Sequence, residues 1–453
     1  MGTLRGVLRI GKRIGDAGGN ERTMATTDSR NSREISPTQA PGGNSALWMV
    51  ITLFFLWGFI TCLNSILIPH LKSLFTLNYA EVMLVNTFFF AAYSVFSLPS
   101  GKVIDWIGYK WTMVAGLVIM AVGALAFLPA AMVPSFPLFL VALAIVAAGM
   151  TFLQVAANPY VAALGPPKTA SSRLNLAQGF NSLGTTVAPY VGSLFILSTV
   201  PLAAAQLQKL SPAALHAYQV AEASVVKLPY TVIAIILVIF ATVMAVYKLP
   251  KIRGTEEAIS EGAPTASIWK QRHLLLAVVG IFVYVGAEVS VGSFLVNYLS
   301  QPDIGNMTEK AAAFYLTFYW LGLMIGRFGG AGITQKLHAG PVLGVAAIAA
   351  FCLVIVSVTT YGHVAMWSII LVGLFNSVMW PNIFGLGLVG LGRLTNLGSS
   401  LLVTGVLGGA LIPLFQGYLA DHIGIHHSFL LLAICYIYIC YFGFSGSKVR
   451  AAA

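Results

Sequence analysis

The chain has 453 residues, of which 58% are hydrophobic and only 9% are charged, and its mean hydropathy is +0.85. A soluble domain carries about 25% charged residues, so the composition excludes an ordinary soluble enzyme and indicates a polytopic membrane protein. The formal net charge of +11 could suggest a nucleic-acid partner, but the positions of the charges along the chain argue against one.

Apolar runs of about 20 residues, long enough to cross a bilayer, occur twelve times. We expect membrane-spanning helices near 46–69, 80–101, 111–131, 136–163, 174–198, 226–247, 274–299, 309–329, 341–361, 363–388, 397–417 and 427–446. With the N-terminus inside, all but four of the 25 Lys and Arg residues fall in internal segments, and Arg327 is counted there as a loop residue. This asymmetry fits the positive-inside rule. The basic charge therefore reflects the topology of the chain in a lipid bilayer and does not indicate a nucleic-acid partner. We expect both termini to be cytoplasmic.

Two polar segments divide the chain. Residues 1–45 are basic and rich in Gly, Ser and Thr, without the apolar core of a secretory signal; we expect a disordered cytoplasmic tail, in which Met24 is an alternative start. Residues 248–273 form the one long internal linker. We therefore predict an N-terminal six-helix bundle (46–247), a cytoplasmic linker (248–273), a C-terminal six-helix bundle (274–447) and a cytoplasmic tail (448–453), with an outer loop at 199–226.

Amide side chains recur within the apolar segments of the first half. Gln154 and Asn158 are four residues apart, so a helix places them on one face. A second face carries Asn175, Gln178, Ser182 and Thr185, with Asn181 beside it. An amide exposed to lipid costs several kcal/mol, so these faces should line an interior cavity. A neutral polar cavity suits a neutral polar solute such as a sugar.

The first span has a polar face of its own. Trp57, Thr61, Asn64 and Ser65 share one side of a helix. This side is a candidate cavity wall, and helix–helix packing through small polar residues is the equally weighted alternative.

A short motif, Gly101-x3-Asp105-x2-Gly108-x-Lys110, joins the second and third spans. A carboxylate at this position can cap a helix N-terminus or pair with an Arg or Lys of a neighbouring helix. We therefore interpret the motif as a conformational latch without a catalytic role. The spacing matches the loop signature of the major facilitator superfamily.

Of the fourteen acidic residues, Glu288 alone lies well inside a predicted span. A charged group there costs at least ~2.5 kcal/mol and suggests function, although a hydrogen-bonded Glu in the bundle interior is the alternative. In the tenth span, Asn376 and Trp380 are four residues apart, with Asn382 nearby. Trp380 could stack on the apolar face of a sugar ring, or it could serve aromatic packing.

Several stretches resemble the fucose–galactose–glucose family of sugar–cation symporters, and its glucose/galactose branch most. They are WGFITCLNSILIPHLK (57–72), LQVAANPYVAALG (153–165), RLNLAQGFNSLGT (173–185), YVGAEVSVGSFLVNYL (284–299) and IGRF (325–328). The resemblance extends from about residue 46 to the C-terminus. It implies a major facilitator fold and sugar uptake across a bacterial inner membrane, with a site between the two halves.

The resemblance also implies residue roles, with one departure. The fucose–proton symporters of this family carry an Asp at the place of Ser65 and a Glu at the place of Gln154, both used for coupling and recognition. Neither position is acidic here. Gln178 and Asn181 match retained sugar-cavity residues, so the resemblance supports binding more strongly than coupling.

We therefore predict an all-α secondary transporter that imports a neutral hexose by alternating access, with a co-transported cation. The predicted substrate-binding residues are Asn64, Gln154, Asn158, Gln178, Asn181, Glu288, Asn376 and Trp380. Glu288 and Ser65 are the coupling candidates, through a proton or through a sodium ion near Glu288 with Ser290 nearby. An uncoupled uniporter and a drug exporter of the same fold are the alternatives. The chain has no GxxxxGK[ST] loop and its histidines lie in loops or at span ends, so we expect neither an ATPase nor a membrane enzyme. We expect a monomer without a cofactor.

Overall fold

The computed structural model describes residues 43–75, 79–133, 135–195, 210–250 and 267–449. Within these ranges, side chains are not described at 43, 63–84, 86, 189–195 and several positions of 212–223. The predicted N-terminal tail to residue 42 and most of the predicted linker lie outside the described residues. Helices account for nearly all of the described chain, and no strand occurs within these ranges. All described residues belong to one compact unit, Ser36–Ala453.

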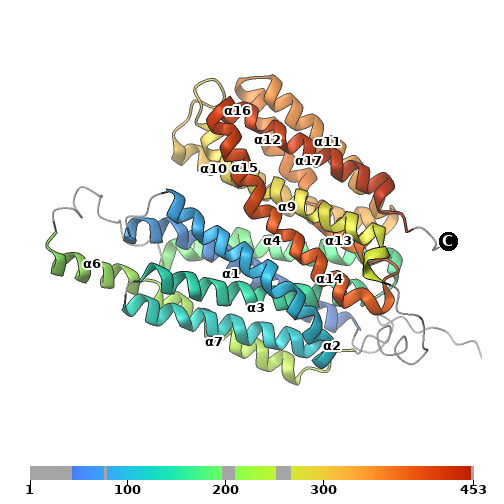
Figure 1. Ribbon diagram of the computed structural model, residues 1–453, viewed down its shortest axis with the longest axis horizontal. Helices are drawn as coiled ribbons and strands as arrows, with labels where there is room; N and C mark the ends of the chain where they lie inside the picture. The colour runs from blue at the N-terminus through green and yellow to red at the C-terminus, as the bar shows by residue number, and fades with distance from the viewer. Residues whose placement is uncertain (1–42, 76–78, 134, 196–209, 251–266, 450–453) are drawn as a thin grey trace, which may run out of the picture. The chain divides into compact units, whose positions relative to one another are not determined.

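The first half of the described chain consists of six α-helices. They are α1 (Gly43–Phe75), α2 (Tyr79–Met132), α3 (Phe136–Ala163), α4 (Ala170–Phe195), α6 (Pro212–Ser224) and α7 (Lys227–Val246). Helix α2 packs against α3 and α7, and α1 packs against α4. These helices, coloured blue to green, lie together in Figure 1.

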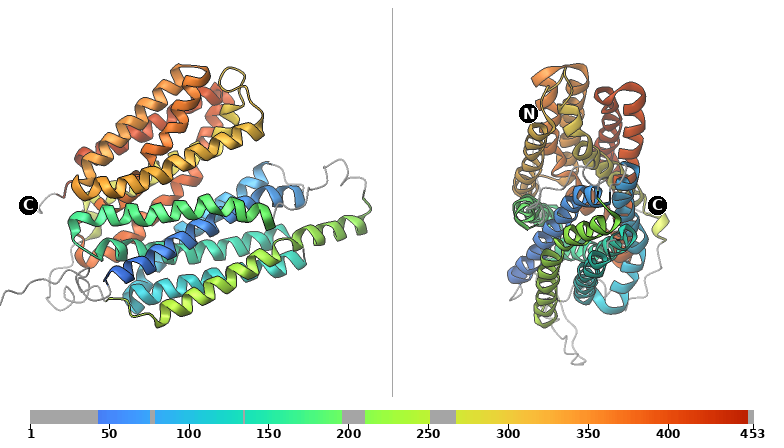
Figure 2. Two further views of the ribbon diagram at one scale, coloured as in Figure 1. Left: turned by 180° about the vertical axis from the view of Figure 1, so that it is seen from behind. Right: turned by 90° about the vertical axis from the view of Figure 1, so that its left-hand side faces the viewer.

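The second half contains three long helices and, from residue 362 on, shorter segments that follow one another within single membrane-spanning stretches. They are α9 (Arg272–Leu299), α10 (Glu309–Lys336), α11 (Ala339–Thr359), α12 (Gly362–Asn376), α13 (Met379–Gly387), α14 (Thr395–Thr404), α15 (Gly408–Ile423), α16 (Ile425–Ser428) and α17 (Leu430–Tyr441). They pack mainly on one another, and α4 with α10 and α2 with α14 are the principal contacts across the halves. Figure 2 shows the two groups from behind and from the side.

Each of the twelve predicted spans overlaps a helix among the described residues. Ten segments among the described residues are long and apolar enough to cross a membrane, one of them being Thr87–Met132 with 46 residues. That segment is long enough to cross a hydrocarbon core of about 30 Å twice, and it breaks at Gly108 (φ 76°, ψ 169°). Counting its two arms separately and adding the more polar α4 gives twelve. A positive φ of this size favours glycine, so Gly108 ends one span and starts the next.

The structure corrects two details of the predicted elements. The outer loop predicted at 199–226 contains the helix α6, which is too short to cross a membrane. The tenth span is interrupted between Asn376 and Met379, and the eleventh contains a 3-10 turn, Gly405–Leu407. Such interruptions leave backbone groups to be satisfied and are tolerated where they are buried in protein or line a cavity.

The side chain of Arg173 holds the turn between α3 and α4. The Arg173 guanidinium donates to the carbonyls of Val161 (3.0 Å), Ala162 (2.5 Å) and Pro166 (3.2 Å). The last turn of a helix leaves carbonyls without i+4 partners, and a cation there is favourable. Arg173 therefore ties the start of α4 to the end of α3, which brings their amide faces together.

Close packing of α1 on α4 depends on Gly58. A Cβ at this position would meet the carbonyl oxygen of Asn181 and would lie 2.9 Å from its Nδ2. We expect Gly58→Ala to lower the free energy of unfolding by about 1–3 kcal/mol, the usual cost of overpacking, as measured by thermal unfolding in detergent. Gly329→Ala is the matched control because no atom lies within 4 Å of a Cβ there. Equal losses in the two variants would contradict this account.

Candidate functional site

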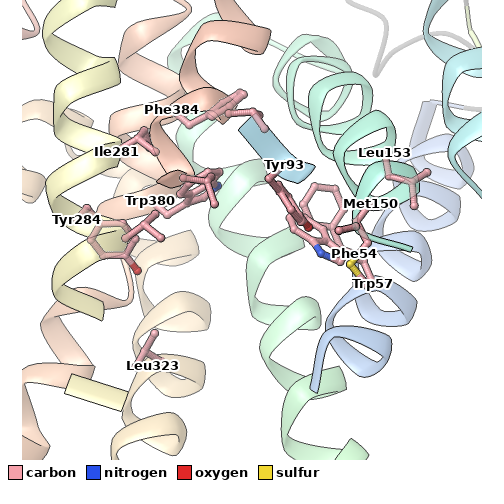
Figure 3. Close-up of a cluster of buried hydrophobic side chains, with 14 of the residues drawn as sticks. Phe54, Trp57, Tyr93, Met150, Leu153, Ile281, Tyr284, Leu323, Trp380 and Phe384 are labelled. Atoms are coloured by element: carbon pink, nitrogen blue, oxygen red, sulfur yellow. The ribbon is translucent and has the colours of Figure 1, made fainter. Parts of the chain in front are cut away.

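A cavity of about 620 Å³ lies between the two halves. Its first-half wall comes from α1, α2, α3 and α4, and its second-half wall comes from α9, α10, the start of α13 and the turn at Val406. The lining residues include Trp57, Thr61, Tyr93, Gln154, Gln178, Asn181, Ser182, Thr185, Thr186, Glu288, Arg327 and Trp380. In Figure 3, Trp57 and Tyr93 lie on one side, and Tyr284 and Trp380 on the other.

Five of the eight predicted binding residues line this cavity: Gln154, Gln178, Asn181, Glu288 and Trp380. The predicted polar face of the first span contributes Trp57 and Thr61. Asn64 and Ser65 lie on α1, but their side chains are outside the described ones.

The structure does not bring Asn158 and Asn376 to the cavity surface. Both are fully buried. Asn158 Nδ2 donates to the Gln154 carbonyl at 2.8 Å, and Asn376 Nδ2 donates to the Tyr319 hydroxyl at 3.1 Å. Each therefore lies behind the wall, in a position to hold neighbouring groups in place.

Four polar atoms of the lining residues have no hydrogen-bond partner although they are buried. They are Gln154 Oε1, Gln178 Nε2, Arg327 Nε and Trp380 Nε1. Such atoms are costly to leave unpaired, and together they offer one acceptor and three donors. Asn181 differs, since its Nδ2 donates to the Phe54 carbonyl at 3.0 Å. The wall thus offers both donors and acceptors, as a hydroxylated ligand requires.

Glu288 and Arg327 form an ion pair at the cavity, with 3.4 Å between Oε1 and Nη2. Their side chains are only 17% and 10% exposed. Arg327 also donates to the Ser182 hydroxyl and, at 3.5 Å, to the Gln178 carbonyl. It therefore links α9 and α10 of the second half to α4 of the first.

The prediction that Arg327 is a loop cation is wrong. Helix α10 continues to Lys336, so Arg327 lies more than two turns inside it. The run of small residues from Gly329 to Gly332 was the available signal, because small residues allow helices to pack closely and so extend the buried segment. The correction changes the chemistry of the site, since the carboxylate predicted to stand alone has a guanidinium beside it.

Hydrogen bonds across the halves close the cavity at one end, which we call the basic end because Lys102, Lys110, Lys168 and Arg393 lie there. Ser172 Oγ donates to the Ala331 carbonyl (2.6 Å), and Ser399 Oγ donates to the Val155 carbonyl (2.7 Å). Further pairs are Asn175 with Asn382 (3.1 Å) and Ser97 with Thr404 (2.6 Å). The lining residues extend instead toward Ala313, near the other end of α10.

Three residues of the motif, Gly101, Asp105 and Lys110, each have a distinct contact at the basic end. A Cβ on Gly101 would meet Ser400 Oγ, so the glycine allows α2 and α14 to approach. Asp105 Oδ1 accepts from Asn396 Nδ2 at 2.6 Å, and Asn396 Oδ1 accepts from the Tyr109 hydroxyl at 2.5 Å. Lys110 Nζ donates to the Ala245 carbonyl at the end of α7, at 2.7 Å.

The partner of Asp105 is therefore an amide in the first turn of α14. The sequence predicts either a cation or a helix N-terminus as the partner of this carboxylate. The N-terminal turn of a helix favours negative charge, which agrees with the second expectation. No group of three or more His, Cys, Asp or Glu residues that could hold a metal ion occurs among the described residues.

Two bundles of transmembrane helices around a cavity that has polar groups on a largely apolar wall, closed at one end, define a membrane carrier. The profile of the Major Facilitator Superfamily matches residues 49–406, and the chain belongs to this superfamily of transporters. It is not an enzyme.

Known proteins are similar over nearly the whole chain. A glucose/galactose transporter of Brucella abortus is 49% identical over 89% of this chain and 94% of its own length. The L-fucose-proton symporter of Escherichia coli K12 is 36% identical over 87% of this chain and 91% of its own length. The crystal structure of the transporter FucP in the outward conformation has a TM-score of 0.79 at 34% identity, covering 89% of this chain and 99% of that one. The predicted family resemblance is confirmed.

Proposed function

We propose that the chain imports a neutral hexose, with glucose and galactose as the first candidates, and takes a cation with it. The observation that carries this proposal is the set of unpaired, buried amide and indole atoms on the cavity wall, Gln154 Oε1, Gln178 Nε2 and Trp380 Nε1. Sugar hydroxyls both donate and accept, which is the hydrogen-bonding chemistry that these atoms lack. The indoles of Trp57 and Trp380 supply apolar faces for the ring. The names of the relatives agree with this substrate class.

Transport would proceed by alternating access in a bacterial inner membrane, with the chain acting as a monomer. The basic end faces the cytoplasm by the positive-inside rule, which leaves the cavity accessible from outside. The hydrogen bonds at the basic end would break, and the outer end would close, once sugar is bound. Similarity to a transporter in the outward conformation supports this assignment.

Glu288 is the proposed coupling residue, and Arg327 favours a proton over sodium there. A guanidinium 3.4 Å from the carboxylate repels a sodium ion by Coulomb's law, whereas a proton adds directly to the carboxylate and weakens the ion pair. The same balance of charge supports the uniporter as the second candidate, because the pair is neutral without any added cation. The role of Ser65 stays a prediction.

Counterflow of radiolabelled glucose in proteoliposomes tests the substrate and the coupling together. We expect counterflow without a gradient and accumulation with an imposed proton gradient. Counterflow without accumulation under either a proton or a sodium gradient would identify a uniporter. If glucose, galactose and fucose all fail to exchange, the proposed substrate class is wrong.

The amide side chains at the cavity should contribute to hexose affinity. Gln178→Ala and Asn181→Ala should each weaken hexose binding by about twofold to tenfold, since a hydrogen bond to a neutral group is worth ~0.5–1.5 kcal/mol. Calorimetry on purified protein measures this change. Thr52→Ala serves as a control, because Thr52 is exposed and bonds only within its own helix, to the Trp48 carbonyl. Wild-type affinity in both amide variants would remove them from the site.

The proposed latch at Asp105 should affect the rate of hexose exchange. Asp105→Asn keeps the size of the side chain but weakens the bond to Asn396 by removing the charge. We expect it to bind hexose in the micelle with near wild-type affinity while exchange slows severalfold, because the motif biases conformations without touching the cavity. Loss of binding in proportion to loss of exchange would contradict the latch.

A further inference from the structure

Arg327 is a buried cation that has hydrogen-bond acceptors other than Glu288. Its Nη1 donates to the Ser182 hydroxyl and to the Gln178 carbonyl, both on α4, whereas Nη2 reaches Glu288 on α9. Two of its three acceptors would therefore remain if the carboxylate were removed. The guanidinium would stay at the cavity wall with an open hydrogen-bonding edge.

Glu288 is the counter-ion at that edge. It forms the one ion pair found among the side chains that the structure describes, and Arg327 Nε is buried without a partner of its own. Guanidinium groups bind carboxylates in a fixed planar geometry, often through two bonds. Both side chains line the cavity, so the carboxylate of Glu288 lies where the carboxylate of a bound ligand would lie.

We infer that Glu288 determines charge specificity, by occupying a carboxylate-binding position on Arg327 so that the cavity accepts neutral hexoses and rejects sugar acids. A hexuronate has the ring of a hexose with a carboxylate at C6. In the intact protein this carboxylate would meet Glu288 and an Arg327 that is already paired. Without the Glu288 carboxylate, the hexuronate would supply the missing counter-ion. The inference rests on the proposed function, since it assumes that a pyranose binds in this cavity.

The test compares glucose and glucuronate binding to purified protein in a low-chloride buffer. Wild type should bind glucose and should bind glucuronate at least tenfold more weakly. Glu288→Ala, which removes the charge and opens space, should improve glucuronate affinity by about tenfold to a hundredfold, the range expected for a hydrogen-bonded charged pair. Glu288→Gln should gain less, because the amide fills the space. The double variant Glu288→Ala/Arg327→Gln should lose the gain.

Formate provides a second measurement that does not require sugar binding. It is small enough to fill the position of the missing carboxylate, so it should raise the unfolding temperature of Glu288→Ala in a saturable manner. It should not do so for wild type or for the double variant.

The outcomes separate the two proposals. If wild type fails to bind glucose, the proposed function fails, while formate stabilisation of Glu288→Ala still supports the carboxylate position on Arg327. If wild type binds glucose but Glu288→Ala gains neither glucuronate affinity nor formate stabilisation, the inference is overturned. It is overturned equally if wild type binds glucuronate as well as glucose, or if the double variant keeps the gain.

Discussion

Glu288→Gln should abolish accumulation of hexose under a proton gradient while leaving counterflow intact. A coupled carrier must tie ion occupancy to conformation through a group whose affinity differs between states. Glu288 is the one acidic residue at the cavity wall among the described residues. An amide at this position resembles a permanently protonated carboxyl group, so exchange can proceed without response to the gradient. The measurement is uptake into proteoliposomes with and without an imposed pH difference.

Ser65→Asp is the companion to that experiment. The parent should accumulate hexose without it if Glu288 is sufficient for coupling. If the parent accumulates nothing and Ser65→Asp switches accumulation on, Glu288 does not couple transport, and the natural chain is a uniporter.

Arg327→Met should be the most destabilising single change at the cavity, lowering the free energy of unfolding by about 3–5 kcal/mol. Breaking a buried ion pair by removing one partner leaves the other charge without compensation. Here the loss includes the bonds to Ser182 and the Gln178 carbonyl, which join the halves. Thermal unfolding in detergent, followed by size-exclusion chromatography, measures the change.

The double variant Glu288→Gln/Arg327→Met is the matched control for this loss. It removes both charges, so it should recover part of the stability that Arg327→Met loses, as replacing a whole buried pair often does. If the double variant is less stable than Arg327→Met alone, the cost does not come from an unpaired carboxylate.

Apolar length and the distribution of Lys and Arg were sufficient to predict the twelve spans, because a membrane imposes both. The amide faces were also predictable, since unpaired polar groups cannot face lipid. Helical spacing predicted polar faces for these residues, and the structure places Gln154 and Gln178 at the cavity. Spacing alone could not distinguish them from Asn158, because residues four apart share a helix face whether that face borders a cavity or packs against other side chains.

The Glu288–Arg327 pair was not predictable from the same patterns. The two residues are 39 positions apart on different helices, so their contact depends on how α9 packs against α10. A cation near the end of an apolar run looks like a loop residue until the true end of the helix, at Lys336, is known. The pairing of Asp105 with Asn396 similarly joins residues 291 positions apart.

The hydrogen bonds that close the cavity at the basic end are made almost wholly by uncharged groups. Serine, threonine and asparagine side chains make these bonds, and Asp105 contributes the one carboxylate among those described. Hydrogen bonds of this kind contribute only ~0.5–1.5 kcal/mol each, and salt screens charges but not neutral dipoles. The free energy needed to break these hydrogen bonds is therefore modest, and it should change little with ionic strength. The rate at which the basic end opens is therefore expected to be similar in dilute and in saline buffers.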